Sequence, residues 1–134
     1  MNTKNLLVLK QKSLQIAILY TITLLIVSLI TIDFGGMDSI VPSYGDKIFH
    51  FLAYGLLTLL WFFAMKWRYN ISKIKTLLFV ATACITFGTV VEVLQKVLTI
   101  SRFYDEADIL SNIFGVILMS ILILLSKKTD VKIY

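Results

Sequence analysis

The sequence predicts an all-α integral membrane protein, a polytopic bundle of four transmembrane helices with both termini in the cytoplasm. Hydrophobic residues make up 58% of the 134 positions and charged residues only 16%, against roughly 25% in soluble domains. The apolar residues gather in four runs, each close to the roughly 20 residues that a helix needs to cross a bilayer. The basic residues bracket these runs instead of covering one face, which excludes nucleic acid as a partner.

The four runs form a single domain over residues 1–134, and each predicts one helix. The predicted spans are about residues 13–32, 46–66, 75–98 and 108–126. We expect the first to be an uncleaved signal-anchor, because three further spans follow it and no A-x-A-like cleavage site is present. The connection before the second span contains Gly35, Gly36 and Pro42, which predict a loop. Strand-like alternation is missing from the sequence, so helices are preferred to a barrel.

The positions of the positive charges predict the orientation. The chain carries 13 Lys and Arg residues, and most of them fall on one side of the four-span arrangement. Those on that side are Lys4, Lys10, Lys12, Lys66, Arg68, Lys73, Lys75, Lys127, Lys128 and Lys132. This asymmetry is the positive-inside pattern, so the termini and the connection 67–74 are expected in the cytoplasm.

Glu92 is the most unusual residue of the third span. It is the only charged residue between Lys75 and Lys96, and a carboxylate there costs about 2.5–3.5 kcal/mol on insertion scales. An ion pair with Lys96, four residues later, is one explanation. A functional site near the extracytoplasmic surface is the other.

Polar residues on three spans favour the second explanation. Asp46, His50 and Tyr54 follow one another at four-residue spacing and share a helix face. A rise of about 1.5 Å per residue places His50 and Asn112 about 6 Å inside their helix ends and Glu92 about 9 Å inside its own. The candidate ligand-binding residues are Asp46, Lys47, His50, Tyr54, Glu92, Gln95, Arg102, Asp108 and Asn112.

Simpler structural roles are open for most of these residues. Asp46 and Asp108 can be N-caps of their helices. His50, Gln95 and Asn112 can make hydrogen bonds between helices. Tyr54 can be a packed aromatic side chain, and Arg102 can be a solvated loop charge.

The sequence predicts no metal ligand and no cofactor. His50, Glu92 and Asp108 are the trio that could hold a divalent ion, but one histidine with scattered carboxylates is a weak metal signature. The single cysteine, Cys84, cannot form an intrachain disulfide, and we expect it to be a small buried hydrophobic residue.

The ordered polar set resembles the VanZ-like family of small bacterial membrane proteins. The resemblance rests on Asp46-Lys47-x-x-His50-Phe51-x-x-Tyr54, then Glu92-x-x-Gln95, then Arg102, Asp108, Asn112 and Gly115, and it covers about residues 46–115. Members often have a proline before the arginine, where this chain has Ile100-Ser101, and a second glycine where it has Met119. The resemblance implies a multi-pass protein of the bacterial cytoplasmic membrane. The family's founding member is associated with reduced susceptibility to the glycopeptide teicoplanin.

Three functions are compatible with this pattern. The preferred one is a binding or modulating protein of the cell envelope, whose partner is a membrane lipid, a lipid-linked cell-wall precursor or a glycopeptide-type amphiphile. The second is an intramembrane hydrolase or transferase acting on the same class of molecule, with His50, Glu92 and Asp108 as catalytic candidates. The third is a small transporter or proton relay, although the cytoplasmic halves of the spans contain almost nothing ionisable.

Overall fold

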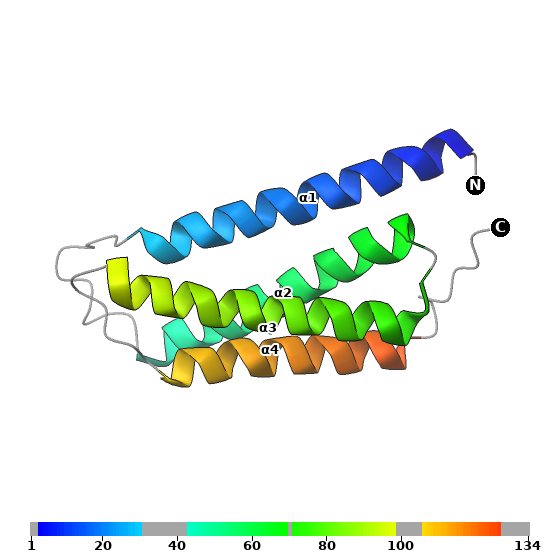
Figure 1. Ribbon diagram of the computed structural model, residues 1–134. Helices are drawn as coiled ribbons and strands as arrows, with labels where there is room; N and C mark the ends of the chain where they lie inside the picture. Colours follow the sequence, from blue (N-terminus) through cyan, green and yellow to red (C-terminus); the bar gives the residue numbers. More distant parts are fainter. Residues whose placement is uncertain (1–2, 31–42, 70, 99–105, 127–134) are drawn as a thin grey trace.

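A computed structural model of the chain describes residues 3–30, 43–69, 71–98 and 106–126 (Figure 1). These residues form four helices: α1 (Thr3–Leu29), α2 (Ser43–Arg68), α3 (Lys73–Leu98) and α4 (Glu106–Leu125). Successive helices run in opposite directions, so α1 and α3 end on the side where α2 and α4 begin (Figure 1). We call this side, marked by Leu29, Ser43, Leu98 and Glu106, the polar end of the bundle, and the opposite side the basic end.

The prediction of an all-α fold with four long helices is confirmed, but all four helices start earlier than predicted, α3 at Lys73 instead of residue 75. The helix α1 begins at Thr3 instead of residue 13, because lysine, glutamine and leucine are good helix formers and extend the helix beyond its apolar run. The helices α2 and α4 start before Asp46 and Asp108, which lie inside the first turn. The N-cap interpretation of both residues is therefore wrong, although an anion in the first turn still interacts favourably with the helix dipole.

The outer surface of the bundle is apolar along all four helices. Large side chains such as Leu19, Phe79 and Phe114 are exposed, each by 60% or more. A helix in a water-soluble bundle instead places charged and polar residues on its outer face. Each of the four helices is long and apolar enough to cross a membrane.

The interior is filled mainly by α2, which packs against the three other helices. Tyr54 and Leu57 of α2 lie in a buried cluster with Val80 and Cys84 of α3 and Val116 of α4. Cys84 is a free, buried thiol, as the sequence predicts. Several serine and threonine hydroxyls donate to the carbonyl four residues earlier, and Thr58 donates to the Tyr54 carbonyl at 2.8 Å in this way.

The helices α2 and α4 touch through their backbones. A Cβ atom on Gly115 would overlap the carbonyl oxygen of Phe51, and one on Gly55 would lie 3.4 Å from the carbonyl oxygen of Gly115. The small residue at 115 therefore serves the contact between α4 and α2. Gly88 does face α4, because a Cβ there would meet the Asn112 amide at 3.2 Å.

The helix α1 is attached by hydrogen bonds from three polar side chains. Tyr20 donates to the carbonyl oxygen of Ala53 at 3.0 Å. Trp61 Nε1 donates to Thr21 Oγ1 at 2.9 Å, and Gln95 Nε2 donates to the Ser28 carbonyl oxygen at 2.7 Å. These bonds fix the rotation of α1 about its axis, since its outer surface is apolar on nearly every side.

At the basic end, side chains complete the helix termini. Ser72 Oγ accepts a hydrogen bond from the amide of Lys75 at 3.4 Å, which is the N-cap arrangement for α3. The ammonium group of Lys73 donates to the carbonyl oxygens of Leu124 and Ser126, at 3.2 and 2.7 Å. It therefore satisfies carbonyls that the end of α4 leaves without an intrahelical partner.

The glycine contact predicts a sharp difference between two substitutions. Gly115→Ala should lower the free energy of unfolding by about 1–3 kcal/mol, because the new methyl group forces α2 and α4 apart. Gly55→Ala should cost less, since its methyl group would make an ordinary van der Waals contact. Reversible unfolding in mixed detergent micelles measures both, and equal stability of the two variants would contradict the backbone contact.

Candidate functional site

Six polar residues from three helices meet at the polar end of the bundle. We call them the polar cluster: Asp46, Lys47 and His50 of α2, Glu92 of α3, and Asp108 and Asn112 of α4. From the observed helix ends, His50 lies about 10 Å inside α2, and Glu92 and Asn112 about 9 Å inside their helices. The three residues thus share one level, and two of them lie deeper than the sequence estimate of about 6 Å.

His50 is at the centre of the polar cluster and is 3% exposed. Its Nδ1 atom lies 3.1 Å from Asn112 Oδ1 and 3.5 Å from Glu92 Oε1. Its Nε2 atom lies 3.7 Å from Asp46 Oδ1 on the opposite side of the ring. One imidazole therefore connects all three helices of the cluster.

The outer part of the polar cluster is more accessible. The carboxylate of Asp46 is 48% exposed, and the side chain of Lys47 is 31% exposed. Lys47 Nζ lies 3.6 Å from Asp108 Oδ1, which joins the first turn of α2 to the first turn of α4. Glu92, by contrast, is 4% exposed and interacts electrostatically with His50, Asp108 and Asp46.

Three buried polar atoms beneath His50 have no hydrogen-bond partner among the described residues. They are Tyr54 Oη, Glu92 Oε1 and Asn112 Nδ2. The phenol ring of Tyr54 and the amide of Asn112 both lie against Gly88, whose missing side chain makes room for them. Buried polar groups nearly always have a partner, so a water, an ion or a ligand normally completes such a group.

The remaining sequence candidates lie elsewhere. Gln95 points to α1 and makes the hydrogen bond to Ser28, which fits its interpretation as a contact between helices. Arg102 is outside the described residues. Lys96 is exposed on α3, whereas Glu92 is buried, and the ion pairs among the described residues do not include this pair. The explanation of Glu92 by Lys96 is therefore not supported.

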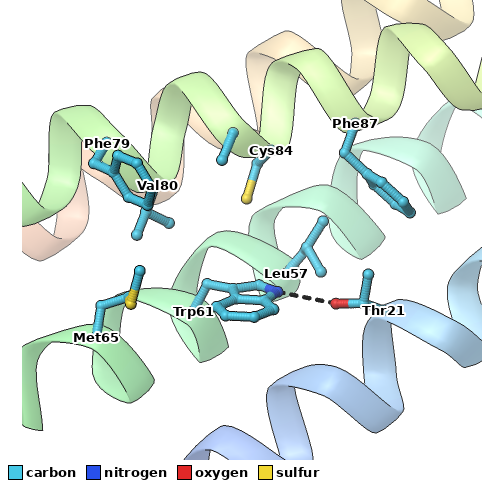
Figure 2. A pocket seen from close by; sticks show the side chains of 9 residues that line it. Thr21, Leu57, Trp61, Met65, Phe79, Val80, Cys84 and Phe87 are labelled. Carbon is cyan, nitrogen blue, oxygen red and sulfur yellow. Dashed lines mark hydrogen bonds between the residues drawn. The ribbon is translucent and has the colours of Figure 1, made fainter. Parts of the chain in front are cut away.

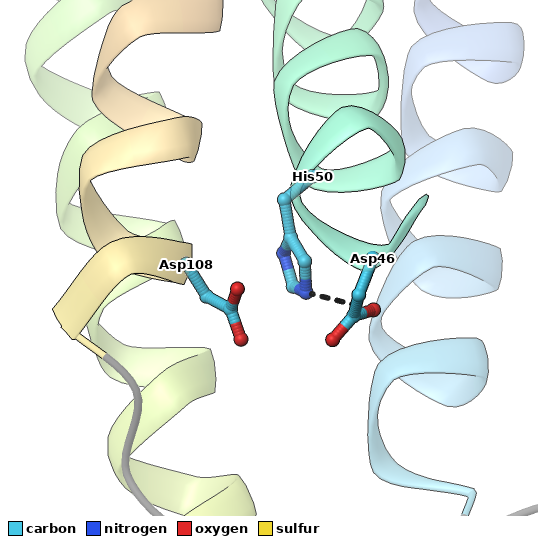
Figure 3. Close-up of side chains that lie close together, drawn as sticks. All are labelled: Asp46, His50 and Asp108. Carbon is cyan, nitrogen blue, oxygen red and sulfur yellow. Dashed lines mark ion pairs between the residues drawn. The ribbon is translucent and has the colours of Figure 1, made fainter. Parts of the chain in front are cut away.

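The polar cluster also contains a geometry that could hold a metal ion. Asp46, His50 and Asp108 each offer one ligand atom, and these atoms lie within 4.8 Å of one another (Figure 3). The sequence analysis had instead grouped Glu92 with His50 and Asp108. Glu92 lies at Nδ1, on the other side of the ring from Asp46.

A pocket that the sequence did not reveal lies nearer the basic end, between α1, α2 and α3 (Figure 2). Its volume is about 350 Å³. The lining is almost entirely apolar and consists of Thr21, Leu57, Trp61, Met65, Phe79, Val80, Ala83, Cys84 and Phe87. The ring of Phe87, which lines this pocket, has its centroid 6.3 Å from that of Tyr54. Since every side of these helices is apolar, no sequence pattern distinguishes the lining residues from those that face outward.

Comparisons with known proteins give no match: no family model, no curated protein and no solved structure is significantly similar to this chain.

The buried hydroxyl of Tyr54 allows a prediction of how its removal changes the free energy of unfolding. Tyr54→Phe should raise the free energy of unfolding by about 1 kcal/mol, because it removes a buried hydroxyl that no hydrogen bond compensates. Tyr20→Phe is the matched control and should lower it by about 0.5–1.5 kcal/mol, since Tyr20 donates to Ala53. Unfolding in mixed micelles compares the two, and a loss of stability in Tyr54→Phe would show that its hydroxyl has a structural partner.

Proposed function

We propose that the protein spans the bacterial cytoplasmic membrane four times, with both termini in the cytoplasm, and binds an envelope amphiphile at the polar end. The amphiphile is a membrane lipid, a lipid-linked cell-wall precursor or a glycopeptide-type molecule. The observation that carries the proposal is the set of three buried polar atoms on Tyr54, Glu92 and Asn112 that have no hydrogen-bond partner among the described residues. A ligand that donates and accepts hydrogen bonds would complete all three.

The charges of the polar cluster favour a headgroup rich in hydroxyl or amine groups. Three carboxylates, on Asp46, Glu92 and Asp108, outnumber the single ammonium group of Lys47 within the described cluster. Carboxylates only accept hydrogen bonds, so they pair with donors such as sugar hydroxyls or ammonium groups. A glycosyl headgroup therefore suits the described residues better than a bare phosphate does.

The apolar pocket supports the same class of ligand, because it can take a hydrocarbon chain. Phe79 and Ala83 are exposed at its rim, so the pocket opens toward the outside of the bundle, where lipid would lie. Along α3, Phe87 precedes Glu92 by five residues, which corresponds to about 7 Å. A molecule with its chain in the pocket would thus bring its headgroup to the polar cluster once the Tyr54 and Phe87 rings move apart.

A second candidate function, an intramembrane hydrolase or transferase, is favoured by the position of His50. Its ring is held by Asn112 and Glu92 at one nitrogen and faces Asp46 at the other. A carboxylate that orients a histidine is the arrangement of a general base. A transporter or proton relay is less favoured, because the buried residues between Tyr54 and the basic end are apolar or carry hydroxyls bonded to backbone, as at Thr58 and Thr76.

A binding experiment tests the proposed ligand class. The melting temperature in detergent should rise with a glycosyl diacylglycerol and should rise little with a phosphatidylcholine that has the same chains. Tyr54→Phe should weaken the glycolipid effect about tenfold, which corresponds to about 1.4 kcal/mol, while Tyr20→Phe should leave it unchanged. An equal response to both lipids would contradict headgroup recognition.

Two further probes separate the alternatives. An acylated glycopeptide should bind more tightly than the same glycopeptide without its acyl chain if the apolar pocket takes part. Mass spectrometry of the glycolipid after incubation should find it intact if the protein only binds. Turnover that His50→Gln abolishes would instead establish the enzyme and overturn pure binding.

The membrane topology has its own test. In a Cys84→Ala background, Glu106→Cys should react with a membrane-impermeant maleimide in intact cells, because Glu106 is exposed at the polar end. Ile71→Cys, in the exposed connection at the basic end, should react only after the membrane is permeabilised. The reverse pattern would place the polar cluster in the cytoplasm.

A further inference from the structure

We propose that Asp46, His50 and Asp108 bind one divalent transition-metal ion, for which zinc is the best fit. The ligands are His50 Nε2, one carboxylate oxygen of Asp46 and one carboxylate oxygen of Asp108 (Figure 3). Asp46 lies in the first turn of α2, His50 lies one turn later, and Asp108 lies in the first turn of α4. The proposal does not rest on the binding of an amphiphile, because its ligand atoms belong to Asp46, His50 and Asp108 and not to the three residues assigned to the amphiphile.

The orientation of the His50 ring is the first argument. Nδ1 lies 3.1 Å from Asn112 Oδ1, and an amide oxygen can only accept a hydrogen bond, so Nδ1 carries the hydrogen. In the neutral ring, Nε2 then has a lone pair, and its nearest charged neighbour is the Asp46 carboxylate at 3.7 Å. Two acceptors face each other there, and a cation between them would satisfy both. A hydrogen bond at the far nitrogen is also the support that metal-bound histidines generally have.

The buried Glu92 carboxylate supports the same site from the other nitrogen of the His50 ring. Its Oε1 atom has no hydrogen bond among the described residues, and it lies 3.5 Å from His50 Nδ1. When a metal binds Nε2, the ring becomes more positive, so a carboxylate beside the Nδ1 hydrogen is stabilised. Glu92 is thus the outer carboxylate of a carboxylate–histidine–metal series, not a ligand.

The donor set selects the class of ion. One imidazole nitrogen with two carboxylate oxygens resembles the three-ligand zinc sites that keep a fourth position open. Calcium takes six to eight oxygen ligands, and magnesium is rarely held by imidazole. Within the described cluster, three carboxylates and one ammonium group carry a formal charge that a divalent ion would balance when His50 is neutral.

The observed geometry has to close slightly around an ion. Bonds of about 2.0–2.1 Å in a tetrahedral site put ligand atoms about 3.3 Å apart, and the present separations reach 4.8 Å. Asp46 can supply this movement by side-chain rotation, because its carboxylate is about half exposed. Lys47 does not prevent coordination, because its side chain is 31% exposed and its ammonium group can turn toward solvent when an ion binds Asp108.

Zinc binding to the purified protein is the direct test. After chelator treatment and removal of the chelator, the wild-type chain in detergent should take up one zinc ion per chain in competition with a chromophoric chelator. Asp46→Asn, His50→Gln and Asp108→Asn should each weaken binding at least tenfold. Glu106→Gln, an exposed acid in the same turn of α4 as Asp108, should leave the affinity unchanged.

Cobalt provides a readout of the ligands themselves. The cobalt-loaded wild type should show the visible absorption of a four-coordinate site, and His50→Gln should shift or abolish it. Asp46→Asn protects the test against unfolding, because Asp46 is exposed and the helical circular dichroism of this variant should match the wild type. Zinc that binds without saturation, or equally well to wild type, Asp46→Asn and Asp108→Asn, would overturn the proposal.

Discussion

The backbone contact between α2 and α4 determines where the other parts of the structure lie. Gly115 allows α4 to approach Phe51 more closely than any residue with a Cβ atom would permit. His50 directly precedes Phe51, and Asn112 lies one turn before Gly115, so the same contact brings the imidazole and the amide to 3.1 Å. One turn closer to the polar end, it brings Lys47 to Asp108. The absence of a side chain at Gly115 therefore allows residues from three helices to meet in the polar cluster.

Burial of the polar cluster costs folding free energy, and the hydrogen bonds and ion pairs within the cluster only partly offset this cost. In hydrocarbon there is no water for a polar group that lacks a protein partner. His50 and Asn112 satisfy each other in part, while Tyr54, Glu92 and Asn112 keep buried atoms without partners among the described residues. A chain under selection for stability alone would replace these residues with leucine or phenylalanine. The proposed binding function accounts for their presence on three helices at one level.

The sequence predicts the number of helices and the level of the polar residues well, because both depend on simple spacing along the chain. Apolar runs of about 20 residues identify the spans, and the rise of the helix places His50, Asn112 and Glu92 at similar depth. The sequence does not predict the direction in which each polar side chain points. Glu92 and Gln95 are only three residues apart, yet Glu92 faces α2 and α4 while Gln95 reaches α1. A helix that is apolar on every side gives no pattern from which its rotation can be derived, and the glycine contacts that fix it depend on the partner helix.

The attachment of α1 has a consequence for how the bundle assembles in a bilayer. Lipid tails are as apolar as leucine, so helices in lipid are held together by close packing and hydrogen bonds. The helix α1 makes three side-chain hydrogen bonds to its neighbours, and bonds of this kind contribute about 0.6 kcal/mol each on average. The helix α1 also buries Ala17 and Leu24 against its neighbours, so packing adds to these bonds. None of the six residues of the polar cluster lies on α1, so this helix positions the wall of the apolar pocket that Thr21 lines and not the cluster itself.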